Sequence, residues 1–313
     1  VWFTLPDGLV VQPFAVAPWA DDPPEKLNAL PPILRHLRGE FPCVPFGVPQ
    51  ARTNLPDQWM DGLDLSTPPA DEFAHGYSTN HKWRLLEQSD TSITIAIDYP
   101  DEHVVSRLKR RISLDGDLQI KIDLHIEMRR DAALPIGLHP MFALPVQSGA
   151  AQLSIPSLQS VRSFPVPVDE RSQCMPDETA DTLTQIQTKD GAMLDVTRLP
   201  LALQTEELLA VSLTEGDVCL SDNQNGYAVG LSWDIDTFPQ CLLWLSNRGR
   251  MAYPWCSRFC AIGIEPVVAA FDLGVAHSAN RHAPFARSGT ATQTSLSAGE
   301  PFTTSYSIGV SEL

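Results

Sequence analysis

The clearest pattern along the chain is an alternation of apolar and polar residues with a period of two, which is typical of half-buried β-strands. The alternation is strongest over 118–128, where Leu, Ile and Met alternate with polar and charged residues. The run 92–99 repeats it, and the turn at 115–117 (Asp-Gly-Asp) predicts a hairpin that joins 118–128 to a strand over 107–114. Further strands are expected at 227–235, 241–246, 259–265 and 303–310.

Helical patterns are few. Residues 27–37 predict a short helix, which Pro31 and Pro32 limit to one or two turns. The proline-rich segment 163–181 is interpreted as an excursion, because strands resume on both sides of it. We therefore expect one all-β domain over 1–313, a large antiparallel β-sandwich with few short helices.

Amino-acid composition indicates a globular protein and excludes some kinds of binding partner. The chain has 22 Lys+Arg and 38 Asp+Glu, so its formal charge is 22 − 38 = −16, and 43% of its residues are hydrophobic, enough for a sizeable core. A negative surface repels phosphate groups, so we expect neither nucleic acid nor an anionic membrane as a partner. The six cysteines are scattered rather than arranged as a framework, which is typical of reduced thiols in a cytoplasmic protein.

Four short segments carry polar residues where neither strand nor turn chemistry requires them. They span 37–47, 75–83, 137–142 and 262–266, and they contain Arg38, His75, His139 and Glu265. Each residue also fits a structural role, as a solvated loop charge for Arg38 or a backbone-bonded loop histidine for His139. Glu265 follows an apolar run, where a carboxyl group must find partners or stay protonated.

In this order the segments resemble the galactose mutarotase-like superfamily, which contains aldose 1-epimerases and, more similar to this chain, glucose-6-phosphate 1-epimerase-like proteins. That family shows Arg-Gly-Gly-x-Pro running on to Phe-Gly, then His-Gly-Phe/Tyr, His-Pro-x-Phe and a strand ending in Glu-Pro. The matching pieces here are Arg38-Gly39 with Phe46-Gly47, His75-Gly76-Tyr77, His139-Pro140-Met141-Phe142 and Glu265-Pro266. The resemblance implies a twisted β-sandwich whose concave face holds a small-molecule sugar.

The resemblance also implies roles for these residues. Glu265 matches the general base and His139 the general acid, His75 contacts the sugar, Arg38 lines the pocket, and Trp244 in the preceding strand flanks it. Trp244 read alone equally fits a core residue. Anomer exchange needs only proton transfers, because the C1 hydroxyl loses a proton, the ring oxygen gains one, and the opened sugar rotates about C1–C2 before it closes. A carboxylate and an imidazole on opposite sides of the hemiacetal suffice, so we expect no cofactor.

Some positions depart from the family pattern. The phosphosugar branch has an arginine where this chain has Thr79, and Glu206 or Glu207 is the nearest candidate for a sugar-contacting acid. His75 and His81 do not have the spacing of a helical metal-ligand pair, so no metal site is expected. His277 and His282 are interpreted as part of a solvated loop.

Three functions remain open at this point. The first is an aldose 1-epimerase that acts on a hexose or a related sugar. The second is a non-catalytic carbohydrate-binding protein with the same fold. The third is a glycoside hydrolase or lyase; an inverting hydrolase needs a second carboxyl group, from Glu206 or Asp222, opposite Glu265.

Overall fold

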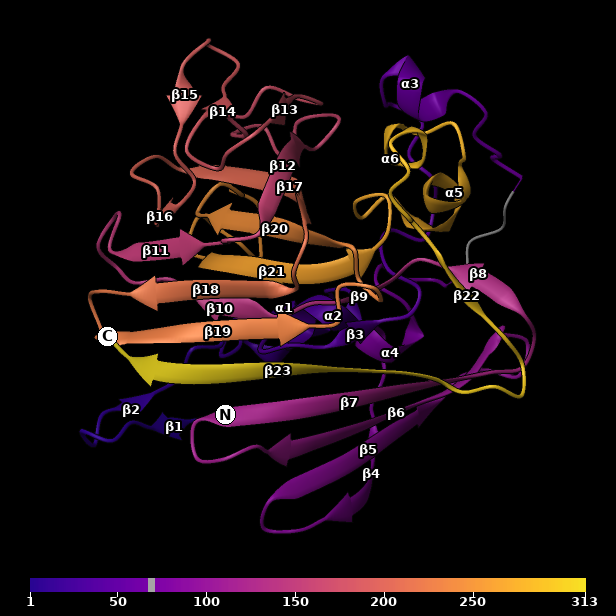
Figure 1. Ribbon diagram of the computed structural model, residues 1–313, viewed down its shortest axis with the longest axis horizontal. Coiled ribbons are helices and arrows are strands. Elements are labelled where there is room, and N and C mark those ends of the chain that lie inside the picture. Colours follow the sequence, from indigo (N-terminus) through magenta and orange to yellow (C-terminus); the bar gives the residue numbers. More distant parts are fainter. Residues whose placement is uncertain (67–70) are drawn as a thin grey trace.

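Two large antiparallel sheets face each other in the computed structural model, which describes residues 1–66 and 71–313 (Figure 1). The first sheet has nine strands in the order β16 (Arg198–Leu199), β11 (Ala151–Ser154), β18 (Asp217–Asp222), β19 (Tyr227–Trp233), β23 (Phe302–Glu312), β7 (Gln119–Met128), β6 (Val105–Leu114), β5 (Ser92–Asp98) and β4 (Arg84–Gln88). The second has eight, in the order β13 (Thr179–Ala180), β12 (Leu158–Ser163), β17 (Thr205–Leu213), β20 (Gln240–Asn247), β21 (Cys260–Val268), β9 (Ile136–Leu138) and β3 (Pro42–Cys43), with β10 (Met141–Ala143) also paired to β21.

Smaller elements connect these sheets. Three two-stranded pairs join β1 (Phe3–Thr4) to β2 (Val10–Val11), β14 (Ile186–Gln187) to β15 (Met193–Leu194), and β8 (Ala132–Leu134) to β22 (Thr294–Leu296). The helices of the described residues are α1 (Pro24–Asn28), α2 (Pro32–Arg35), α3 (Asp57–Met60), α4 (Tyr77–Asn80), α5 (Gly274–Ala279) and α6 (Pro284–Arg287). No helix within 1–66 and 71–313 is long and apolar enough to cross a membrane.

The expected β-sandwich with few short helices is confirmed. The strong alternation over 118–128 forms β7, which makes the predicted hairpin with β6. The helix expected over 27–37 is replaced by two short helices, α1 and α2, each of which begins at a proline because proline has the backbone angle of a first helical turn. The strand expected to end at Glu265 continues to Val268, so Glu265 lies inside β21 and not at its end.

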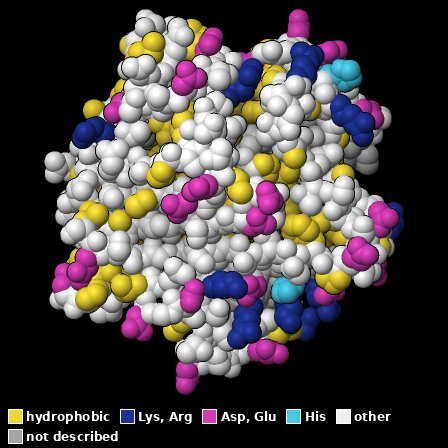
Figure 2. All heavy atoms as spheres, in the orientation of Figure 1, with side chains coloured by type: hydrophobic (Ala, Val, Ile, Leu, Met, Phe, Trp, Pro, Cys, Tyr) yellow, Lys and Arg dark blue, Asp and Glu magenta, His cyan; other side chains and the backbone are white. Residues whose placement is uncertain are grey.

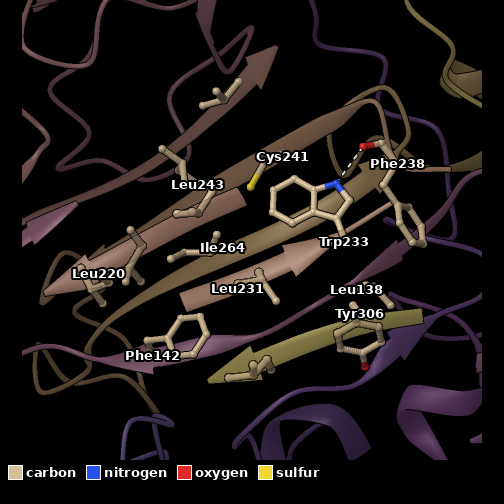
Figure 3. Close-up of a cluster of buried hydrophobic side chains, with 14 of the residues drawn as sticks. Leu138, Phe142, Leu220, Leu231, Trp233, Phe238, Cys241, Leu243, Ile264 and Tyr306 are labelled. Atoms are coloured by element: carbon tan, nitrogen blue, oxygen red, sulfur yellow. Dashed lines mark hydrogen bonds between the residues drawn. The ribbon is translucent and has the colours of Figure 1, made fainter. Parts of the chain in front are cut away.

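The main hydrophobic core lies between the two sheets. Leu220, Leu231 and Trp233 point inward from the nine-stranded sheet, and Leu243 and Ile264 meet them from the eight-stranded sheet (Figure 3). The indole Nε1 of this tryptophan donates a hydrogen bond of 3.0 Å to the carbonyl oxygen of Phe238 (Figure 3). Its only polar atom is therefore satisfied inside the core.

A second apolar layer covers the other face of the eight-stranded sheet. Neighbouring residues of a strand point to opposite faces, so Leu242 and Trp244 on β20 point away from the sandwich core. They pack against aromatic side chains that include Trp19, Trp255 and Phe259. Strand β20 is consequently buried on both faces along its whole length, and the sheet has an outer face that loops enclose.

The loops of this outer layer come from distant parts of the chain. In Figure 1, α3 lies beside α5 and α6 at one end of the molecule. The side chain of Asn280, which follows α5, donates a hydrogen bond of 3.0 Å to the carbonyl oxygen of Asp61, which follows α3. His277 is fully buried within α5 and bonds at 2.9 Å to the carbonyl oxygen of Arg52, so its interpretation as a solvated loop residue is wrong. Its neighbour in that interpretation, His282, is exposed.

Charges of both signs share the surface. Acidic side chains are scattered over the face in Figure 2, and Lys and Arg side chains lie both near its top and in its lower part, where Figure 1 has β4 to β7. On this sheet Asp98 pairs with Arg84 at 2.9 Å and with Arg107 at 2.5 Å. The net charge of −16 is therefore not spread as a uniform negative field.

Candidate active site

Two neighbouring strands place Trp244 and Glu265 on the outer face of the eight-stranded sheet. In the antiparallel register of β20 and β21, Trp244 lies opposite Gly263 and Leu242 lies opposite Glu265. The isoleucines at 262 and 264 point into the sandwich core, so the alternation of the strand directs the Glu265 side chain away from them. The carboxyl group is nonetheless buried, with the residue 2% exposed, because the loops of the outer layer cover it.

His139 reaches this carboxyl group from the link between β9 and β10. Both strands pair with β21, and the backbone N–H of Ile264 donates to the carbonyl oxygen of Pro140 at 3.0 Å. The N–H of His139 itself donates to the carbonyl oxygen of Phe41 at 2.9 Å. These bonds hold His139 Nε2 at 3.5 Å from Glu265 Oε1, with both side chains almost fully buried.

His75 forms the third side of this cluster. Its ring packs edge-on against that of His139 with 5.2 Å between centroids and against Phe46 at 4.9 Å. The backbone of His75 is left-handed (φ 64°) and its N–H donates to the carbonyl oxygen of Gly47 at 2.8 Å. Gly76 follows with φ 82° and lies so close to the backbone of Val44 that a Cβ would be 2.5 Å from its oxygen. The first two sequence segments are thereby fixed side by side.

These side chains line a cavity of about 370 Å³, within the size range of small-molecule sites. Trp244 and Trp255 form aromatic walls, which suit the apolar faces of a sugar ring. The polar residues of the lining are Glu72, His75, His139, Arg250, Glu265 and Asp272. Of the five residues predicted from the sequence, the structure therefore brings together His75, His139, Trp244 and Glu265.

Arg38 is not brought to this cavity. It is exposed, its Nε donates to the carbonyl oxygen of His36 at 3.3 Å, and it is absent from the cavity lining. The arginine in the lining is Arg250, which sequence reasoning missed. Its guanidinium lies over Trp255 at 4.6 Å and over Trp244 at 5.6 Å from the ring centroids. The sequence signal next to Arg250 is Gly249. A Cβ at this glycine would be 2.6 Å from the carbonyl oxygen of Thr205, so the glycine lets the chain before Arg250 lie close to β17.

Glu206 holds Trp244 and Arg250 in place from behind the cavity. Its Oε1 accepts a hydrogen bond from Trp244 Nε1 at 2.7 Å and forms an ion pair with Arg250 Nε at 3.1 Å, and the residue is fully buried. Glu207 instead accepts the backbone N–H of Gln173 at 2.5 Å, and so anchors the excursion after β12. Neither glutamate belongs to the cavity lining.

The environment shifts the proton affinities of the buried pair in opposite directions. Burial, and then the charge of Asp272, raises the pKa of Glu265 well above its usual value. Burial, and then the neighbouring His75, lowers the pKa of His139 well below its usual value. The pKa of His75 falls to about 4 because of burial. Burial therefore favours the neutral forms of the Glu265–His139 pair, a carboxylic acid and an imidazole.

A metal site needs several ligating side chains close together. In the described part of the chain, no group of three or more His, Cys, Asp or Glu side chains is placed so that it could bind a metal ion. His81, considered with His75 as a ligand pair, directs Nδ1 to the carbonyl oxygen of Tyr77 at 3.0 Å. Asp222, the second candidate acid for a hydrolase, is bonded to the N–H groups of Gln224 and Asn225 in a turn and lies outside the lining.

Solved structures with this architecture are known, although no protein-family model and no curated protein sequence matches the chain. A candidate aldose 1-epimerase of Escherichia coli K12 superposes with a TM-score of 0.60 at 18% identity, over 90% of this chain and 86% of that one. An aldose epimerase homologue from C. elegans gives 0.59 at 13% identity, over 100% and 91% of the two chains. A galactose mutarotase related enzyme from Lactobacillus acidophilus gives 0.54 at 16% identity, over 88% and 83%. The chain thus has the galactose mutarotase-like fold.

Proposed function

We propose that this protein is a cofactor-independent aldose 1-epimerase, which interconverts the α and β anomers of a hexose or a related sugar. The observation that carries the proposal is the approach of His139 Nε2 to Glu265 Oε1, at 3.5 Å, in the wall of a cavity that two tryptophans also line. An acid–base pair in a sugar-sized cavity provides what anomer exchange requires.

The reaction can be followed as a count of protons. The proton of the Glu265 carboxylic acid first passes to His139 Nε2, 3.5 Å away, which gives the pair as carboxylate and imidazolium. Glu265 then takes the proton of the C1 hydroxyl while His139 gives its proton to the ring oxygen. The C1–O5 bond breaks, C1 becomes an aldehyde, and the pair is left as carboxylic acid and imidazole. After rotation about C1–C2, the carboxylic acid protonates the aldehyde oxygen, the imidazole takes the O5 proton, and the other anomer forms. The pair holds one transferable proton throughout.

The positions of acid and base follow from the hemiacetal. Sequence reasoning expected the two groups on opposite sides of it, whereas His139 and Glu265 lie side by side. The two oxygens that exchange protons are bonded to the same carbon, so a side-by-side pair reaches both when C1 points at it. The sugar then lies against the tryptophan walls, with its remaining hydroxyls toward the polar lining.

The cavity favours an uncharged sugar over a sugar phosphate. Its lining includes three carboxyl groups, on Glu72, Glu265 and Asp272, and one cation, Arg250, whose Nε is already bound to Glu206. Thr79, where the phosphosugar branch has arginine, directs its hydroxyl at 2.8 Å to the carbonyl oxygen of His75. Carboxyl groups repel a phosphate, and no guanidinium fork comes from this position to bind it.

Magnetisation-transfer NMR tests the proposal by measuring anomer exchange of glucose, galactose and their 6-phosphates. We expect the wild-type protein to accelerate exchange of an uncharged hexose. His139→Ala and Glu265→Gln should each reduce the rate by about 10²–10⁴-fold, the usual contribution of a positioned acid or base. His125→Ala and Glu127→Gln, on the solvent face of β7, are the matched controls. No acceleration with any aldose would refute the enzymatic proposal.

A second candidate is a sugar-binding protein without turnover. The position of Arg38 favours it, because a pocket residue implied by the family resemblance lies outside the cavity. Calorimetric binding of a hexose by a protein that does not accelerate exchange would select this candidate.

A further inference from the structure

The carboxyl group of Asp272 has no role in the acid–base pair, yet it lines the same cavity. Asp272 lies four residues after the end of β21, in the turn that leads to α5. An aspartate just before a helix commonly caps it, but no side chain makes a capping hydrogen bond to α5. Its position therefore needs another explanation.

The backbone around Asp272 is fixed by close contacts with a second loop. The N–H of Val48 donates to the carbonyl oxygen of Asp272 at 2.7 Å. A Cβ on Gly47 would lie 2.6 Å from that same oxygen, so only glycine permits the approach. The preceding residue, Phe271, is fully buried and has a left-handed backbone (φ 50°). Strain of this kind persists where the surroundings determine the conformation, and it is common at binding sites.

The side chain held by this backbone is incompletely satisfied. Its Oδ1 is buried and has no hydrogen-bond partner among the residues that the structure describes. Arg52 and Arg250 are near enough to favour its charged form, although burial opposes it and raises the pKa of Asp272 overall. A buried carboxyl oxygen without a donor is costly, and native proteins seldom keep one without a function.

We propose that Asp272 is a substrate-binding residue that accepts hydrogen bonds from hydroxyl groups of the sugar whose C1 faces His139 and Glu265. The inference rests on the proposed sugar site, but not on turnover. A carboxylate has two oxygens and accepts hydrogen bonds from two adjacent hydroxyls, so the group it recognises is a vicinal diol. Arg250, in the same lining, offers donors to the oxygens of these hydroxyls.

A ligand-and-variant cycle tests this assignment. Dissociation constants are measured by calorimetry for a hexose and for its monodeoxy analogues, with the wild-type protein, Asp272→Asn and the surface control Asp236→Asn. We expect Asp272→Asn to weaken hexose binding at least tenfold while its midpoint of thermal unfolding stays at or above the wild-type value. At least one deoxy analogue should bind the wild type about tenfold more weakly than the hexose does. The same analogue should bind Asp272→Asn no more than about twofold more weakly than the hexose, since the deoxy sugar and the variant each remove the same hydrogen bond.

Two results would overturn the assignment: unchanged hexose affinity in Asp272→Asn, or equal losses for every deoxy analogue in variant and wild type. Asp272→Ala repeats the cycle should the amide disturb folding. Failure of the proposed function is distinguishable, because a protein that binds sugar through Asp272 without accelerating anomer exchange upholds the assignment and removes only the enzyme.

Discussion

Gly263 is the residue that gives the carboxyl group of Glu265 its position. The two residues lie on the same face of β21, because side chains two positions apart share a face. A Cβ on Gly263 would collide with Glu265 Oε1 and approach Trp244 Cβ to 3.2 Å. The absence of a side chain at this position therefore lets the carboxyl group lie along the strand toward His139.

Gly263→Ala should displace the carboxyl group and reduce the rate of anomer exchange about 10²-fold, because misplacement of a reacting group by about 1 Å costs a factor of that size. Gly230→Ala on β19 is the matched control, since a Cβ there meets no atom within 4 Å. Rates come from magnetisation-transfer NMR and folding from thermal melts. A wild-type rate in Gly263→Ala would show that the glycine does not position Glu265.

His75 should leave a mark on the pH dependence of stability. Its pKa falls from 6.5 to about 4 on folding, so the unfolded chain binds the proton first as pH decreases. The stability that His75 contributes is complete above pH 6.5 and is lost as pH falls toward 4, by about 3 kcal/mol.

His75→Asn, chosen because asparagine tolerates a left-handed backbone, removes this term. The free energy of unfolding of the variant, relative to wild type, should rise by about 3 kcal/mol between pH 6.5 and 4 in urea titrations. His125→Asn, which removes a half-exposed histidine, is the control. A constant difference between His75→Asn and wild type across this range would contradict the lowered pKa of His75 in the folded protein.

The sequence located the residues of the site that lie within motifs, but not those whose position depends on the folding of loops. His75, His139 and Glu265 occur in recognisable segments, and all three line the cavity. Arg38 belongs to such a segment too, yet its side chain lies outside. The loop of Asp272 is held against Gly47, more than 200 residues earlier, and no local pattern reveals that contact.

At the scale of elements, adjacent residues of β20 lie in different layers, one in the sandwich core and one at the cavity. Leu243 points into the sandwich core and is fully buried, whereas Trp244 points into the outer layer and lines the cavity. The same strand thus serves two layers through its two faces.

Leu243→Ala should lower the free energy of unfolding by about 2–5 kcal/mol, the cost of a cavity in a packed core, and leave sugar affinity unchanged. Trp244→Phe should weaken sugar binding about tenfold, because it shrinks the aromatic wall and removes the indole donor to Glu206. Urea unfolding and calorimetry measure the two effects. If Leu243→Ala weakened sugar binding while Trp244→Phe changed only the free energy of unfolding, the sugar site would not lie on the outer face of the eight-stranded sheet.

The sequence predicts the position of a strand well when one face of the strand is solvated, and less well when both faces are buried. The alternation over 118–128 identifies β7 because polar residues face the solvent. In β21 apolar residues face both the sandwich core and the outer layer, so the period of two is hidden and the strand continues three residues beyond Glu265. The length of β21 is fixed by its pairing with β20 and, at Val268, with β9, and not by its own pattern.

At the scale of the whole molecule, the site assembles because separate segments are tied to the two sheets. Glu40 in the first segment binds Arg110 of β6 and Tyr306 of β23, in a buried cluster where Arg110 Nη2 donates to the tyrosine oxygen at 2.8 Å. Phe41, next in sequence, packs against His139 with 4.7 Å between ring centroids. The nine-stranded sheet thereby contributes to the position of the imidazole, although none of its strands contributes a residue to the cavity lining.

The most direct test of the account is the rate of anomer exchange in wild type, His139→Ala, Glu265→Gln and the double variant, measured side by side on one hexose. A pair that shares a single transferable proton acts as a unit, so the double variant should be about as slow as the slower single variant. Losses that multiply, or single variants as fast as wild type, would contradict a joint role for His139 and Glu265.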